Sequence, residues 1–168
     1  MARKRPPRLL QFSYVGRNAY FLTICCEARR PVFSDLNYGE IIVSRFLQLA
    51  AEYSFADSGY CLMPDHLHAV VEGLNERSDF TRFVSMFKQR TAYAHRQITG
   101  DRLWQEGYYE RVIRPDESIV GLVAYMLHNP IRAGLCHAVT EYPLLGSKRY
   151  GLSELMDAVQ CPPPRSRP

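Results

Sequence analysis

Residues 58–72 contain two strand-like runs separated by only two residues, and this spacing constrains the fold more than any other feature. The runs, residues 58–63 and 66–72, are rich in residues that favour strands, and Pro64 and Asp65 between them are typical of a tight turn. Strands joined by so short a turn pair antiparallel. We therefore expect these residues to form neighbouring strands of an antiparallel sheet.

The rest of the chain continues this pattern of strands and helices. Residues 19–26 are rich in β-branched and aromatic side chains, which predicts a strand. Helical spacing of apolar residues predicts helices at residues 40–53 and 78–98, and a third helix that follows Pro115-Asp116-Glu117 and runs to about Asn129. Short β-rich runs predict two short strands around Gly107. The order strand, helix, strand, strand opens a split βαβ unit. We expect an α+β fold with a ferredoxin-like antiparallel sheet and helices on one face.

The length of 168 residues suits one domain, and the 46% hydrophobic content is high enough for a packed core. We expect a flexible basic arm at residues 1–13, a catalytic domain at residues 14–150 and a largely disordered tail at residues 151–168. No apolar run approaches the ~20 residues that span a bilayer, and the N-terminus lacks the apolar segment of a secretory signal. We therefore expect no membrane association.

The cysteines are odd in number and lack Cys-x-x-Cys spacing, which argues against a disulfide framework or a zinc ribbon. They are Cys25, Cys26, Cys61, Cys136 and Cys161. We therefore expect a reduced, cytoplasmic protein.

The formal net charge of +4 favours a polyanionic partner, and arginine supplies most of the positive charge. Several basic residues lie off the apolar stripe of the predicted helix at 78–98. They include Arg82, Lys88, Arg90 and Arg96. This cluster suits a helix that faces phosphates, although an ordinary solvated helix surface explains each residue singly.

His66 and His68 lie two residues apart in a predicted strand. Alternate residues of a strand point to the same face, so both imidazoles lie on one wall while Leu67 points to the other. Two imidazoles so placed can bind one metal ion. The alternative is that each is an ordinary histidine of the core or the surface.

Tyr125 does not share the apolar stripe of the last predicted helix. That stripe, read as core, is Ile119, Leu122, Val123, Met126 and Leu127. Asn129 lies one turn beyond Tyr125 on the same flank. If this flank faced the two histidines, a phenol, an amide oxygen and two imidazoles would meet in one site. The alternative is a tyrosine that simply lies on the surface with its hydroxyl in water.

Four motifs in this order resemble the tyrosine transposases of the IS200/IS605 type, and among them the REP-associated branch. They are MPDHLH at 63–68, FKQRTA at 87–92, LWQEGYYERVIR at 103–114 and YMLHNPIRAGL at 125–135. The resemblance covers residues 14–150.

The resemblance implies an HUH single-strand DNA endonuclease and strand transferase. In such enzymes a histidine pair holds a divalent metal, here Mg²⁺ or Mn²⁺, and a tyrosine attacks DNA to form a 5′-phosphotyrosine link. His66 and His68 match the metal-binding pair, and Tyr125 matches the nucleophile. Asn129 falls where the family places a third polar ligand. Residue spacing alone did not distinguish Tyr125 from Tyr93, Tyr108 or Tyr109.

The resemblance also implies a substrate, single-stranded or hairpin DNA of palindromic repeats. Aromatic residues could stack on unpaired bases and basic residues could bind the backbone. The candidates are Arg82, Lys88, Arg90, Arg96, Trp104, Tyr108 and Arg114, with Arg3, Lys4 and Arg5 in the N-terminal arm. The alternatives are that Trp104 belongs to the core and that the arm only aids solubility. The location implied is cytoplasmic and nucleoid-associated, and the protein is a monomer or a homodimer.

Two rival functions remain at this point. One is a domesticated, sequence-specific hairpin-DNA-binding protein that keeps the fold without transposition activity. The other is a zinc hydrolase built on His66 and His68, which predicts activity that survives Tyr125→Phe. Retention of both histidines and of Tyr125 favours the transposase chemistry.

Overall fold

The structure is a computed structural model that describes residues 12–159 of the chain. Its strands and main helices are β1 (Ala19–Cys25), α1 (Leu36–Glu52), β2 (Phe55–Met63), β3 (His66–Gly73), α2 (Phe80–Thr99), β4 (Tyr109–Ile113), α3 (Ile119–Leu127), α4 (Asn129–Arg132), β5 (Leu145–Gly146) and α5 (Leu152–Val159). Short 3-10 helices occur at Glu27–Arg29, Val32–Ser34 and Val139–Glu141.

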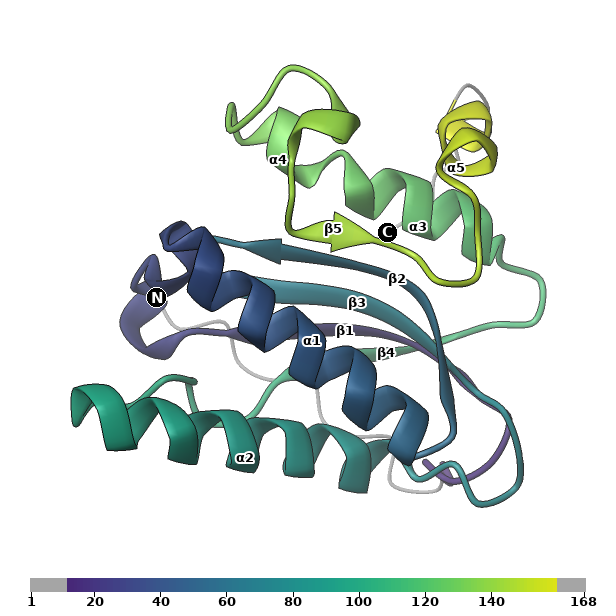
Figure 1. The fold of residues 1–168 in the computed structure, drawn as a ribbon. Coiled ribbons are helices and arrows are strands. Elements are labelled where there is room, and N and C mark those ends of the chain that lie inside the picture. Colours follow the sequence, from purple (N-terminus) through teal and green to yellow (C-terminus); the bar gives the residue numbers. More distant parts are fainter. Residues whose placement is uncertain (1–11, 160–168) are drawn as a thin grey trace.

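The five strands form one antiparallel sheet in the order β4-β1-β3-β2-β5 (Figure 1). The predicted turn at Pro64 and Asp65 joins β2 to β3. His68 of β3 lies opposite Thr23 of β1 on one side and opposite Cys61 of β2 on the other. Directly opposite residues of antiparallel strands point to the same face, so these three side chains share a face of the sheet.

Helices α1 and α2 cover one face of the sheet (Figure 1). Asp35 begins α1 by accepting a hydrogen bond from the backbone N–H of Tyr38, and Asp79 begins α2 in the same way. Gly100 ends α2 in the left-handed conformation, with φ of 77°. Apolar side chains of both helices are buried in the core against this face, among them Ile42, Phe46, Leu49, Phe80, Phe83 and Phe87.

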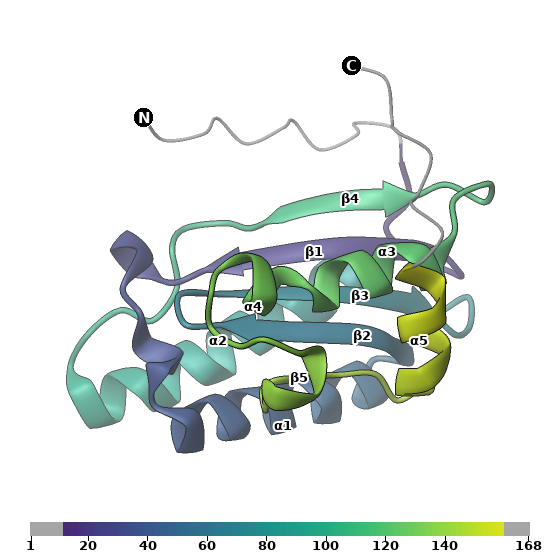
Figure 2. The ribbon, with the colours of Figure 1, turned by 90° about the horizontal axis from the view of Figure 1, so that it is seen from above.

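Helix α3 crosses the opposite face of the sheet, with α5 packed against it (Figure 2). Val123 and Met126 of α3 are buried in a second core cluster with Cys61 and Val70 of the sheet. Gly59 permits this close approach, because a Cβ atom there would lie 2.5 Å from Val123 Cγ1. The α+β fold is confirmed, but the expectation of helices on one face holds only for α1 and α2.

Several predicted boundaries require correction. The helix expected to run to about Asn129 ends at Leu127. It begins after Ser118, whose side chain accepts from the N–H of Gly121, and Glu117 closes residues 114–117 into a turn just before it. Of the two short strands expected around Gly107, only the second is a regular strand, β4; before Gly107, Trp104 forms an isolated bridge with Cys26. Residues 152–159, expected to lie in a disordered tail, form α5, because Leu155 is buried in the second core cluster.

Residues 1–11 and 160–168 lie outside the described part of the chain, and with them most of the predicted arm and the end of the predicted tail. Within residues 12–159, no helix combines the length and the apolar character needed to cross a bilayer.

Candidate functional site

His66 and His68 meet on the face of the sheet that carries α3. Both lie on β3 beside Cys61 and Met63 of β2, which are buried against α3. The two Nε2 atoms are 2.9 Å apart, and the ring centroids are 4.5 Å apart. The period-2 geometry of the strand thus places both imidazoles on one wall, as the sequence predicted, and brings their outer nitrogens to a common point.

The other nitrogen of each imidazole is held by a neighbouring side chain. His66 Nδ1 lies 2.5 Å from Asp65 Oδ1, and His68 Nδ1 lies 2.8 Å from Thr23 Oγ1. Asp65 is itself held by Arg29, whose Nε lies 2.8 Å from Asp65 Oδ2. When Nδ1 carries the proton and donates it, the Nε2 lone pair is free to bind a metal. Asp65, Thr23 and Arg29 therefore orient the pair.

These three supporting residues were missed by the sequence reasoning. Asp65 could have been found, because it directly precedes the histidine pair. Thr23 comes from β1, and only the register of β1 with β3 shows that it lies opposite His68. Arg29 lies in a short segment where Ala28 and Arg29 both have positive φ, of 51° and 56°. No local pattern predicts that conformation in residues other than glycine.

Burial favours the neutral form of both histidines. Burial, together with smaller effects of the neighbouring His66, Arg29 and Arg132, lowers the pKa of His68 to about 3. Burial also lowers the pKa of His66, against the opposing effect of Asp65. Neutral imidazoles at physiological pH are the form that binds metal ions.

Tyr125 lies on α3 with its side chain 57% exposed, off the buried stripe of Val123, Met126 and Leu127. The helix ends at Leu127, and a new short helix, α4, begins at Asn129 with Pro130 in its first turn. The sequence predicted that Asn129 lies one turn beyond Tyr125 in the same helix. This prediction is wrong, because Asn129 belongs to the next helix. Proline cannot donate a backbone hydrogen bond to continue the helix, which explains the break.

Arg132 of α4 links Tyr125 and Asn129. Its Nη2 donates to the backbone oxygen of Tyr125 at 3.1 Å and also to Asn129 Oδ1. Its guanidinium carbon lies 4.1 Å from the centre of the Tyr125 ring. Its charge contributes to the lowered pKa of His68, so the guanidinium also lies near the histidine pair. The sequence analysis did not select Arg132, although it lies in the Asn-Pro-Ile-Arg run of a quoted motif.

The other tyrosines considered as nucleophiles differ in their surroundings. Tyr93 is 68% exposed on α2, on the layer opposite α3. Tyr108 is half-buried and packs against Phe80 of that same layer. Tyr109 is 45% exposed, and it lies opposite Thr23, so it shares the face of the histidines. Two exposed tyrosines, Tyr125 and Tyr109, therefore lie on the histidine side of the sheet.

The family model for transposases of the IS200-like kind matches residues 15–126, two-thirds of the chain. The chain belongs to the IS200-like transposase family. Membership assigns it a transposase-like function on DNA.

Relatives place the chain near the REP-associated branch of that family. A Haemophilus influenzae protein named as a candidate REP-associated tyrosine transposase is 25% identical over 136 residues, which cover 74% of this chain and 76% of the relative. The REP-associated tyrosine transposase of Escherichia coli K12 is 20% identical over 130 residues, which cover 77% and 76%.

One solved structure shares the fold. It is a REP-associated tyrosine transposase bound to a REP hairpin, which superimposes with a TM-score of 0.69 at 17% identity and covers 83% of this chain and 82% of that chain. This similarity confirms the α+β transposase fold.

Three of the predicted DNA-binding residues pack or form hydrogen bonds inside the protein instead of lying free on its surface. Trp104 is only 4% exposed, and its Nε1 donates to Thr91 Oγ1 at 2.8 Å, so it is not available to stack on a base. Lys88 Nζ donates to the backbone oxygens of Gln105 and Gly107, which ties α2 to the loop before β4. Tyr108 packs beside them. The core alternative for Trp104 is therefore the correct one.

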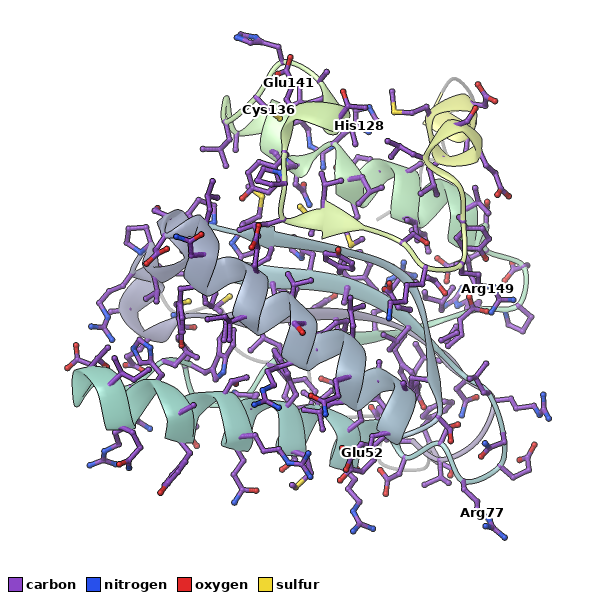
Figure 3. The ribbon with its side chains drawn as sticks, in the orientation of Figure 1. Glu52, Arg77, His128, Cys136, Glu141 and Arg149 are labelled. Carbon is purple, nitrogen blue, oxygen red and sulfur yellow. The ribbon has the colours of Figure 1, made fainter. Side chains whose placement is uncertain are left out.

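The remaining basic candidates are spread over the surface. Arg90 forms an ion pair with Glu52 of α1 at 3.0 Å, on the helix layer remote from the His128 end of α3 (Figure 3). Arg82 lies over the Tyr53 ring at 6.0 Å, and Arg96 is exposed near the end of α2. Arg114 is exposed just after β4. The structure thus separates the α2 candidates from the histidines, and Arg3, Lys4 and Arg5 lie outside the described residues.

The donor set suits a metal ion bound by nitrogen and neutral oxygen. Among residues 12–159, no three side chains of His, Cys, Asp or Glu gather closely enough to hold a metal. His66 and His68 therefore need a ligand of another kind. The Asn129 amide oxygen and a phosphate oxygen of a bound substrate both have suitable chemistry for Mg²⁺ or Mn²⁺.

Proposed function

We propose that this protein is a metal-dependent single-stranded DNA endonuclease and strand transferase. It acts on hairpin-forming repeats through a 5′-phosphotyrosine intermediate formed by Tyr125. The observation that carries the proposal is the histidine pair, with Nε2 atoms 2.9 Å apart and both Nδ1 atoms held by other side chains. Such a pair, set on the same side of the sheet as an exposed tyrosine, suits metal-assisted attack on a phosphodiester.

His66 and His68 would hold the divalent ion, with Asn129 as a third ligand. Mg²⁺ or Mn²⁺ bound there would offset negative charge on a phosphate oxygen and orient the phosphorus for attack. Asp65 and Thr23 contribute by holding the two Nδ1 atoms, which orients the imidazoles so that both Nε2 atoms face the ion. Asn129 Oδ1 accepts a hydrogen bond from Arg132 in this structure, so Arg132 and the metal ion compete for that oxygen.

Tyr125 carries out the covalent step. Its hydroxyl oxygen attacks the scissile phosphorus and its proton passes to water, so a new P–O bond forms while the bond to the 3′ oxygen breaks. The departing 3′ oxygen gains a proton and leaves as a 3′ hydroxyl. The 5′ phosphate remains joined to the tyrosine as a diester, so a 3′ hydroxyl can later reverse the step without ATP.

Hairpin DNA is the proposed substrate because the solved neighbour was bound to a REP hairpin. On this chain Arg132 is an exposed cation beside Tyr125, and Arg29 is an exposed cation bound to Asp65 next to His66. Arg111 lies on the histidine face of the sheet. Backbone phosphates bind such arginines, and Tyr109 offers an exposed ring on that face for an unpaired base. We further propose a cytoplasmic, nucleoid-associated protein acting as a monomer or a homodimer.

The test is covalent capture of labelled single-stranded hairpin oligonucleotides drawn from repeats that flank the gene, with Mg²⁺, Mn²⁺ or EDTA. The native protein should yield a metal-dependent nick and a protein–DNA adduct on a denaturing gel. Tyr125→Phe should yield neither. Tyr93→Phe, which alters another exposed tyrosine on the opposite layer, serves as the matched control and should behave as the native protein does.

Other outcomes of this test identify the rivals. An adduct that persists in Tyr125→Phe and disappears in Tyr109→Phe would identify Tyr109, on β4, as the nucleophile. Cleavage that survives both substitutions without an adduct would favour a metal hydrolase. Tight binding with no cleavage of any oligonucleotide would indicate the domesticated DNA-binding protein.

A further inference from the structure

We propose that Arg132 binds the scissile phosphate, and so is a catalytic residue of the tyrosine transfer reaction. This inference rests on the proposed function and names a residue that the histidine and tyrosine motif does not include. It is carried by the contacts of the Arg132 guanidinium and by the lack of a carboxylate beside it.

The Arg132 guanidinium packs against Tyr125, and its charge reaches the metal-binding pair. It lies over the Tyr125 ring, with 4.1 Å from its central carbon to the ring centre, and its Nη2 is anchored to the Tyr125 backbone oxygen. Its charge also acts on His68. A phosphate positioned for attack by the Tyr125 hydroxyl, and bound through one oxygen at the histidine pair, would therefore lie next to Arg132.

No carboxylate neutralises Arg132. Among residues 12–159, no Asp or Glu oxygen lies within 4.0 Å of its guanidinium nitrogens. The other arginines near this face are paired, Arg29 with Asp65 at 2.8 Å and Arg111 with Glu117 at 2.5 Å. An unpaired guanidinium keeps its full charge for an anion, and its fork of donors matches two phosphate oxygens.

A purely structural role accounts for only part of this arrangement. One nitrogen, Nη2, donates both to the Tyr125 carbonyl at the end of α3 and to Asn129 Oδ1. Arginine carries five N–H donors, so these two bonds leave others for a ligand. A neutral side chain could cap the helix end equally well, and glutamine can donate to a carbonyl. Arg132→Gln therefore removes the charge while it retains a donor near α3.

The experiment compares Arg132→Gln with the native protein in single-turnover adduct formation on two oligonucleotides. One carries an ordinary phosphodiester at the scissile position, and the other carries a methylphosphonate, which lacks the negative charge. Arg45→Gln is the matched control, because Arg45 is exposed on α1, on the opposite layer. Among residues 12–159, its side chain hydrogen-bonds only to Gln48. Thermal unfolding of each variant reports whether the fold is intact.

On the phosphodiester, Arg132→Gln should slow adduct formation by ~100-fold or more, the usual loss when one preorganised donor to a developing charge is removed. On the methylphosphonate, the variant and the native protein should react at rates within about 3-fold of each other, since there is no charge left to neutralise. Arg132→Lys, which keeps the charge without the fork, should fall between the two on the phosphodiester.

Two results would overturn the proposal. Equal rates for Arg132→Gln and the native protein on the phosphodiester would show that Arg132 does not act on the phosphate. The same loss on both oligonucleotides would show that it supports the structure around Tyr125 instead. Failure of the proposed function is distinct from either, because the native protein would then form no adduct at all.

Discussion

The two faces of the sheet use the same kinds of polar side chain in different ways. On the face covered by α1 and α2, polar groups close the core: Trp104 donates to Thr91, and Tyr38 shares a hydrogen bond of 3.0 Å with His95. On the face of α3 and α4, His66 and His68 keep their Nε2 atoms turned toward each other, and Arg132 forms no ion pair within residues 12–159. We call the first face the structural face and the second, where we propose that the chemistry takes place, the reactive face.

This comparison shows why residue type alone is a poor guide to function in a small α+β domain. Arginines, tyrosines and histidines occur on both faces. What distinguishes the reactive face is that neighbours hold the Nδ1 atoms of His66 and His68, while the two Nε2 atoms face only each other within the described part of the chain. Substitutions on the two faces should therefore separate loss of activity from loss of stability.

The largest effect is expected for His68→Ala. Loss of one imidazole ligand should slow metal-dependent adduct formation by ~1000-fold or more, because a metal ion contributes several kcal/mol of charge stabilisation in such reactions. The free energy of unfolding should change less than for a core substitution, since the half-buried imidazole belongs to neither apolar core cluster. Single-turnover gels and urea unfolding measure the two quantities. His137→Ala, an exposed histidine beyond α4, is the control.

If His68→Ala destabilised the protein by as much as a core substitution, the histidine would have a structural role. The proposed division into a structural face and a reactive face would then be wrong for the residue on which it mainly depends.

Trp104→Ala should show the opposite behaviour. Removing a buried indole and its hydrogen bond to Thr91 should lower the free energy of unfolding by about 3–5 kcal/mol. Per folded molecule, affinity for a single-stranded oligonucleotide should stay unchanged, because the ring does not reach the surface. Urea unfolding and fluorescence anisotropy with a labelled oligonucleotide test this. A large loss of DNA affinity in a stable variant would restore the stacking role that the sequence suggested.

These contrasts also explain which features the sequence could predict. The β2–β3 hairpin and the shared face of His66 and His68 follow from local rules, the alternation of side chains along a strand and the turn residues between strands. The burial of Trp104 does not, because it depends on α2 packing over the loop before β4. An aromatic residue near basic residues has the same local signature in a core and in a DNA-binding surface.

The reactive face was predicted only in part for the same reason. Tyr125 falls off the apolar stripe of its own helix, so its exposure can be read from sequence. The break at His128 changes the course of the chain before Asn129, and it brings Arg132 back over Tyr125. Likewise, the contact of Thr23 with His68 depends on strand register. Non-local geometry of this kind has no local signal.

Asp65→Asn should have a smaller effect, confined to the reactive face. The amide no longer accepts the proton of His66 Nδ1 as strongly, so orientation and basicity of the ring both suffer. We expect Mn²⁺ affinity to fall by about 10–100-fold, the usual effect of losing such a partner. Mn²⁺ titration followed by electron paramagnetic resonance measures this without DNA. Asp116→Asn, in the turn before α3, is the control. Equal Mn²⁺ affinities of the native protein, Asp65→Asn and Asp116→Asn would show that Asp65 does not support the metal site.

The smallest effect is expected at Asp57, a buried carboxyl group of the structural face that lacks a hydrogen-bond partner within residues 12–159 for one of its oxygens. Asp57 is 5% exposed beside a cavity of about 420 Å³ between α1 and the start of β2. Its Oδ2 accepts from the backbone N–H of Lys148 at 3.1 Å, whereas Oδ1 has no hydrogen-bond partner among the described residues. Burial raises the pKa of this carboxyl from 3.8 to about 6.

The direction of the resulting pH dependence follows from linkage. A carboxyl with a raised pKa in the folded state favours folding fully below the unfolded pKa of 3.8, and that contribution is lost as pH rises through about 6. Asp57→Asn cannot ionise, so relative to the native protein its free energy of unfolding should rise between pH 4.5 and pH 8, by on the order of 2 kcal/mol. Urea unfolding at the two pH values measures the difference. A difference that stays constant with pH would mean that Asp57 is ionised in the folded protein at both values, and that the structural face tolerates a buried charge.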